Sequence, residues 1–149
     1  MDEHPSIRDL LNGGFIGVGR LMFKILIVED HLSFRETLKA YLNDELSWVI
    51  LEEAANAKEA MEKVGLFRPD LIFMDIHLPE GSGLELMKKI LPSYPNTKIV
   101  IMTGYELTVY RELAAQYGAI GFFSKGEATG RDILAFVKPF QLVKGSGGG

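Results

Sequence analysis

The chain contains no cysteine, which excludes a disulfide framework and thiolate metal sites. A cysteine-free chain is compatible with a reducing compartment, and we expect a cytoplasmic location. The sequence also lacks a basic excess, because 16 Lys and Arg stand against 20 Asp and Glu, a formal net charge of −4. This balance argues against nucleic-acid binding by the chain itself. No apolar run approaches the roughly 18–20 residues of a membrane helix, so no membrane contact is expected.

What is present is the composition of an average globular protein, with 47% hydrophobic and 24% charged residues among 149. A chain of this length fits one domain. We assign that domain to residues 23–138, because regular patterning begins near Phe23. Residues 1–22 are interpreted as an N-terminal extension that is flexible or foreign to the domain. Residues 139–149 end in a Gly-rich run and are interpreted as a linker or a truncated end.

Five short apolar runs, rich in Ile, Val and Phe, are typical of strands that are buried on both faces. They lie at residues 24–28, 48–53, 71–74, 98–102 and 119–123. Segments with apolar residues at helical spacing follow each run, the first with a capping-box pattern at Ser33 and Glu36. Pro139 is expected to end the fifth helix. The alternation predicts an α/β fold, a doubly wound, five-stranded parallel sheet of order 2-1-3-4-5 with five helices, as in flavodoxin-like proteins.

Polar residues follow these strands, and in an open parallel sheet such residues meet at the edge where ligands bind. They are Glu29 and Asp30 after the first strand, Asp75 after the third, Thr103 after the fourth and Lys125 after the fifth. The second strand ends on Glu52 and Glu53 and adds no obvious partner. Each residue alone has an ordinary explanation, since acids favour helix N-termini, Thr-Gly forms turns and most lysines are solvated. Their convergence on one edge favours a shared site.

The chemistry follows from the charges. Three carboxylates at one edge repel each other unless a cation neutralises them. An oxygen-only cluster, with no Cys and no His placed to chelate, suits Mg²⁺. Lys125 can pair with a phosphoryl oxygen, and the Thr103 hydroxyl can donate to another. Asp75 is then a carboxylate placed to attack phosphorus and form an aspartyl phosphate.

With these residues in place, the chain resembles the receiver domain of two-component response regulators. The resemblance covers about residues 23–137. It depends on four fragments in this order, "ILIVEDH" (25–31), "LIFMDIHLPEGSGLEL" (71–86), "IVIMTGY" (99–105) and "GAIGFFSKGE" (118–127). It implies a signalling domain that promotes its own Mg²⁺-dependent phosphorylation and dephosphorylation, rather than a conventional enzyme.

The resemblance also implies roles for the matched positions. Asp75 corresponds to the phosphoacceptor, assisted by Thr103 and Lys125. The implied Mg²⁺ ligands are Glu29 (more through water than directly), Asp30 (directly), Asp75 and the backbone carbonyl of His77. Thr103 and Phe122 correspond to the switch pair. The rim of the site would be formed by Pro79, Gly83 and Tyr105.

The implied partner is a sensor histidine kinase or a phosphotransfer protein. Phosphorylation would change the face made by the fourth helix, the fifth strand and the fifth helix, which is also a candidate homodimer surface. The fragments "EDHLSFRETLKAYL" and "GFFSKGE" are more similar to receivers that precede helix-turn-helix DNA-binding domains. Such an output domain is absent from these 149 residues.

The sequence departs from the family pattern in three places. Phe122 stands where Tyr is frequent in the family, so the ring has no hydroxyl that could form a hydrogen bond on switching. Gly126 follows Lys125 where Pro is common, and Pro139 shortens the last helix. His77 and Tyr105 are bulky residues beside the expected phosphoryl site, and we predict slow autodephosphorylation because they hinder an attacking water.

Other readings remain open at this point. A module of the same fold that is never phosphorylated would lack one of the site residues. A flavin carrier would need a Ser/Thr/Gly-rich phosphate loop in place of "EDHLSF". A phosphatase of the haloacid-dehalogenase type would need a second Asp where His77 stands. A metal hydrolase would need a further His at a strand end, but the others are His4 and His31.

Overall fold

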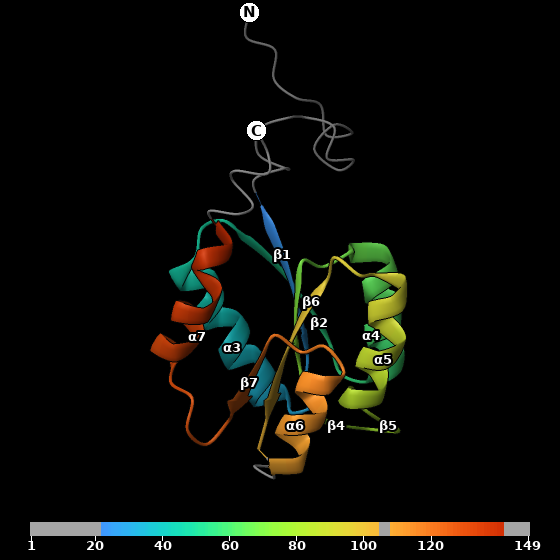
Figure 1. Cartoon of the computed structure of the whole chain (residues 1–149). Coiled ribbons are helices and arrows are strands. Elements are labelled where there is room, and N and C mark those ends of the chain that lie inside the picture. The colour runs from blue at the N-terminus through green and yellow to red at the C-terminus, as the bar shows by residue number, and fades with distance from the viewer. Residues whose placement is uncertain (1–21, 105–107, 142–149) are drawn as a thin grey trace, which may run out of the picture.

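The structure is a computed structural model that describes residues 22–104 and 108–141. Five parallel strands form its main sheet (Figure 1). They are β1 (Phe23–Val28), β2 (Val49–Ala54), β3 (Leu71–Met74), β6 (Lys98–Thr103) and β7 (Gly121–Ser124). Their spatial order is β2-β1-β3-β6-β7, which is 2-1-3-4-5 when these strands are counted along the chain. The predicted fold class is confirmed.

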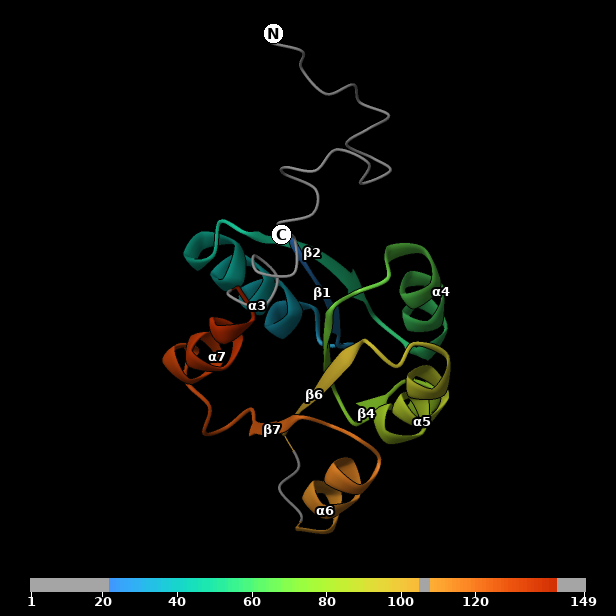
Figure 2. The same cartoon turned by 45° about the horizontal axis from the view of Figure 1, so that its top comes forward.

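Five helices cover the two faces of the sheet within the described ranges (Figures 1 and 2). They are α3 (Leu32–Glu45), α4 (Ala57–Phe67), α5 (Gly83–Ser93), α6 (Thr108–Gln116) and α7 (Gly130–Val137). Helices α3 and α7 lie on one face, and α4, α5 and α6 lie on the other. Residues 105–107, which precede α6, are outside the described residues.

The apolar runs form strands with two buried faces because successive side chains alternate between the two helical layers. In β1, Ile25 and Ile27 belong to the core under α3 and α7, whereas Leu26 and Val28 belong to the core under α4, α5 and α6. All four side chains are at most 1% exposed. The sheet is therefore a rigid support for whatever follows its strands.

The helix starts were only partly predictable. The Asn56 side chain caps α4 by accepting from the Glu59 N–H at 2.8 Å. The capping box expected at Ser33 and Glu36 is wrong, because α3 begins two residues earlier with His31 at the N-cap position. The backbone N–H of His31 donates to the Glu29 carboxylate at 3.0 Å, so the polar residues before the helix orient its start.

A short antiparallel hairpin, β4 (His77–Leu78) with β5 (Gly81–Ser82), lies between β3 and α5 and was not predicted. Its turn contains Glu80 in the left-handed region at φ 60°. The hairpin reverses the chain, so that Gly83 at the start of α5 returns beneath the end of β3. An added Cβ at Gly83 would lie 1.9 Å from the Asp75 carbonyl oxygen.

Helix α7 ends at Val137, close to the expected stop at Pro139. Beyond the proline, the ring of Phe140 stacks on Phe23 at 5.3 Å and contacts Phe136 at 5.9 Å between centroids. The chain therefore still contacts the core after Pro139. Among the residues described, no helix combines the length and the apolar character needed to cross a membrane.

Candidate functional site

The candidate site lies at the carboxyl ends of four strands. The backbone continues the sheet ladder one residue past each of three of these strands, which fixes where the polar side chains start. The Glu29 N–H donates to Ala54 O at 2.9 Å, the Asp75 N–H to Val28 O at 3.1 Å, and the Lys125 N–H to Thr103 O at 2.8 Å. Thr103 is the last residue of β6 and is fully buried.

Two of the three carboxylates are buried, since Glu29 is 2% and Asp75 is 5% exposed, whereas Asp30 is exposed. The Lys125 ammonium neutralises part of this charge. Its Nζ donates to Asp75 Oδ2 at 2.9 Å and is also ion-paired with Glu29. Burial lowers the pKa of Lys125, but hydrogen bonds to Glu29 and Asp75 outweigh it and raise that pKa above its usual value. The Lys125 ammonium is therefore held as a cation between the carboxylates that follow β1 and β3.

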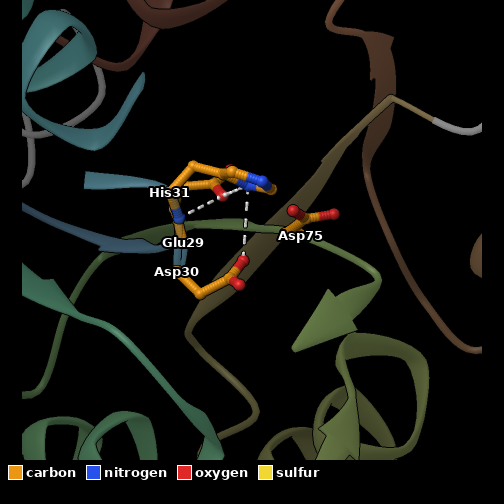
Figure 3. A group of neighbouring side chains, drawn as sticks. All are labelled: Glu29, Asp30, His31 and Asp75. Carbon is orange, nitrogen blue, oxygen red and sulfur yellow. Dashed lines mark hydrogen bonds and ion pairs between the residues drawn. The ribbon is translucent and has the colours of Figure 1, made fainter. Parts of the chain in front are cut away.

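The acidic cluster has a member that the sequence did not predict. One ligand atom from each of four residues lies within 4.8 Å of the others, and these residues are Glu29, Asp30, His31 and Asp75 (Figure 3). His31 Nδ1 lies 3.1 Å from Glu29 Oε2 and 3.5 Å from Asp30 Oδ1. The prediction that no His is placed to chelate is wrong, because the N-cap position of His31 brings its ring over the acidic pair, Glu29 and Asp30, and into the same group of possible ligands.

The donor set fits a hard divalent cation. Three carboxylates converge, and only part of their charge is balanced by Lys125. Carboxylate oxygens are the preferred ligands of Mg²⁺. Glu29, Asp30 and Asp75 would supply these oxygens.

His77 lies two residues after Asp75, at the start of β4. Its backbone N–H donates to Asp75 Oδ1 at 3.3 Å, and its exposed ring makes an edge contact with Tyr110 of α6, 5.7 Å between centroids. Pro79 is in the turn of the β4–β5 hairpin. Gly83 is buried and packs beneath Asp75. Tyr105 falls outside the described residues.

Phe122 is in β7, three residues before Lys125, and its ring is half-buried. The guanidinium carbon of Arg111, on α6, lies 4.5 Å from the centroid of this ring. A cation therefore covers the aromatic ring that lacks a hydroxyl.

A second network behind the acidic pair was also missed. Arg35 Nη1 donates to the Glu29 carbonyl at 2.7 Å, and Arg35 Nε donates to Glu53 Oε1 at 2.7 Å. The second strand was expected to add no partner to the site, and the partners of Glu53 itself were not predictable because they come from α3, a helix that follows a different strand. The only available signal was that both Arg35 and Lys39 are basic and lie one turn apart.

The comparisons with known proteins agree with this geometry. A family model described as the response regulator receiver domain matches residues 25–138. The transcriptional regulatory protein YdfI of Bacillus subtilis (strain 168) is 38% identical over 104 residues, 70% of this chain and 48% of that protein. The response regulator GacA of Pseudomonas syringae pv. syringae (strain B728a) is 32% identical over 122 residues, 82% of this chain and 55% of that protein. The chain thus spans about half the length of these relatives.

Solved structures show the same fold. A CheY-like response regulator receiver domain protein from Methanospirillum hungatei JF-1 superposes with a TM-score of 0.75 and 28% identity, covering 84% of this chain and 98% of that one. A two-component response regulator from Clostridium difficile superposes with a TM-score of 0.73 and 29% identity. The match covers 79% of this chain and 94% of that one.

Proposed function

Since the chain belongs to the response regulator receiver domain family, we propose that Asp75 accepts a phosphoryl group in a Mg²⁺-dependent step. One observation carries the proposal: Asp75 is a buried carboxylate at the end of a central strand, with the Lys125 ammonium 2.9 Å from its Oδ2 and the acidic pair beside it. An Asp carboxylate can act as a nucleophile and form a covalent aspartyl phosphate.

In the proposed reaction, an oxygen of Asp75 attacks the phosphorus of a phosphohistidine on a kinase or phosphotransfer protein. The P–O bond to Asp75 forms as the P–N bond breaks, and the imidazole leaves. When bound, Mg²⁺ would supply charge neutralisation of the phosphoryl oxygens. Lys125 moves its hydrogen bond from the carboxylate to a phosphoryl oxygen, and the Thr103 hydroxyl donates to another. The backbone carbonyl of His77 would complete the ligands.

The same proposal covers the response to phosphorylation. The added charge draws the Thr103 hydroxyl toward the phosphoryl group, and the Phe122 ring follows. This movement changes the face formed by α6, β7 and α7. That face is our candidate for partner binding or homodimer formation. Because the relatives are about twice as long and one is named a transcriptional regulatory protein, we also propose that the whole protein carries a DNA-binding output domain.

The test is incubation with Mg²⁺ and acetyl phosphate, followed by intact-mass measurement. We expect the wild type to gain one phosphoryl group and Asp75→Asn to gain none. Asp44→Asn is the matched control, because Asp44 is an exposed acid in α3, and it should behave as the wild type. A chelator should abolish the gain. An unmodified wild type would support a non-phosphorylated interaction module instead, whereas an Asp75→Asn variant that is modified equally would show that another residue accepts the phosphoryl group.

A further inference from the structure

Arg35 connects two elements that meet behind the acidic pair. It lies in the first turns of α3, and its side chain is only 13% exposed. Its Nη1 donates to the Glu29 carbonyl and its Nε donates to Glu53 Oε1, both at 2.7 Å. Because the guanidinium is a rigid plane, two short hydrogen bonds to different groups fix its position.

Glu53, which anchors Arg35 at one end, is itself held by a second basic residue. Glu53 is in β2, and its second oxygen accepts from Lys39 Nζ at 2.8 Å. The hydrogen bond from Lys39, followed by that from Arg35, holds the pKa of Glu53 below its usual value. Glu53 therefore stays ionised at neutral pH and serves as a fixed anchor for Arg35 on the edge strand.

The near end is the peptide that joins Glu29 to Asp30. The N–H of Glu29 donates to Ala54 O at 2.9 Å, and its C=O accepts from Arg35, so the backbone of Glu29 is held on both sides. This carbonyl belongs to the same peptide plane as the N–H of Asp30, and its orientation decides where the Asp30 side chain begins. Without Arg35, the peptide loses its partner at the point where the chain leaves β1.

We propose that Arg35 is a positioning residue for the metal-binding acidic pair, because it fixes the Glu29–Asp30 peptide and so presents both carboxylates to a divalent cation. The inference rests on the Mg²⁺ site of the proposed function. Arg35 acts through the backbone and makes no contact with the cation.

The positive charge of Arg35, taken alone, predicts the opposite effect on Mg²⁺ affinity from the positioning role, so an experiment can distinguish the two. Replacing Arg35 by Met removes a positive charge near the carboxylates and should strengthen Mg²⁺ binding if charge is the only factor. Positioning predicts weaker binding. Groups that orient metal ligands typically change metal affinity by about 10–100-fold, and we expect the lower end, about tenfold, because Arg35 acts on the backbone.

The experiment is calorimetric titration of the whole chain with Mg²⁺ alone. We expect the dissociation constant to rise about tenfold in Arg35→Met. Lys39→Met is the matched control, because it removes a charge from the same cluster without touching Glu29, and it should bind as tightly as the wild type or more tightly. Arg35→Lys keeps the charge but cannot reproduce the two-pronged contact, so it should show a smaller increase. Urea denaturation establishes that each titrated variant is folded.

The outcomes separate the two proposals. A wild type that binds no Mg²⁺ overturns both. A wild type that binds Mg²⁺, with Arg35→Met binding equally or more tightly, overturns only the positioning role of Arg35. If Arg35→Met does not fold, Arg35→Lys decides, and an unchanged dissociation constant in that variant overturns the inference.

Discussion

At the scale of single residues, Gly83 shows how closely the support of the site is packed. A Cβ there would lie 1.9 Å from the Asp75 carbonyl oxygen and 2.9 Å from Met74 Cγ, so either the start of α5 or the end of β3 must move. Gly83→Ala should therefore lower the free energy of unfolding by about 1–3 kcal/mol and slow phosphorylation by acetyl phosphate. Gly126→Ala is the control, because its nearest contact would be Ser124 Oγ at 3.9 Å. Equal stability of the two variants would contradict this packing.

The pairing of Glu53 leads to a prediction about how the stability of the fold depends on pH. The pKa of Glu53 is lowered by Lys39 and then by Arg35, so its pairing stabilises the fold above the unfolded value of about 4.5 and is lost as pH falls through the lowered folded value. Glu53→Gln should be less stable than the wild type by about 1 kcal/mol at neutral pH. The difference should shrink as the pH falls below 4.5 and through the lowered folded pKa of Glu53.

The measurement is urea denaturation followed by fluorescence of Trp48, the single tryptophan, which is half-buried against Phe23. Lys39→Met should show the same narrowing with a smaller amplitude, because Arg35 still holds Glu53 in that variant. Stability curves of wild type and Glu53→Gln that run parallel across the acid range would show that the pairing adds nothing.

Single residues also mark where sequence reasoning succeeded and where it stopped. Asp75 and Lys125 were placed at one edge because parallel strands all end there, and the structure joins them at 2.9 Å. His31 and the Arg35–Glu53 pair were missed, because their partners depend on the direction in which α3 leaves β1. That direction is decided by side-chain hydrogen bonds, which a periodic pattern does not record.

At the scale of elements, the alternation of strands and helices was sufficient to predict the sheet order. The β4–β5 hairpin was not predictable, since two-residue strands carry no period. The contact made by Phe140 was also missed, because Pro139 indicated only where the helix stops. Whether the domain ends at residue 138 stays a prediction, although Phe140 packs against two core rings beyond it.

Phe140 supports a prediction at this scale. Its ring covers the beginning of β1 and the end of α7, so Phe140→Ala should lower the free energy of unfolding by about 1–2 kcal/mol, less than a fully buried phenylalanine. Leu66→Ala is the control, because Leu66 is 86% exposed, and it should change stability by less than about 0.5 kcal/mol. If both variants unfold at the same urea concentration as the wild type, Phe140 is not part of the fold.

The contact between β4 and α6 leads to a second prediction. His77 is held against Tyr110, beside the proposed phosphoryl site. His77→Ala should shorten the lifetime of the aspartyl phosphate several-fold, because it opens a path for water, and Tyr110→Ala should do so more weakly. Tyr110→Phe keeps the ring and should leave the lifetime unchanged. The measurement is the rate of phosphate release after the donor is removed, and equal rates in all four proteins would contradict the prediction.

At the scale of the whole molecule, the proposed site and the ends of the described chain lie at opposite edges of the sheet (Figure 1). The site is at the carboxyl ends of the strands, whereas Phe23 at the start of β1 meets Phe140 at the other edge. A change at the site therefore has to pass through the elements between these two edges to reach the end of the described chain. The α6, β7 and α7 face is the proposed route, since Arg111 of α6 already contacts Phe122 of β7.

The central claim is that the phosphoryl group resides on Asp75 and not on a neighbouring acid. Borohydride reduces an aspartyl phosphate to homoserine, so reduction of the phosphorylated protein followed by peptide mass mapping locates the modified residue. We predict homoserine at position 75 only, and no conversion when Mg²⁺ or the phosphodonor is omitted. Conversion at Asp30 or elsewhere with Asp75 intact, or no conversion in a protein that has gained phosphate, would contradict the account.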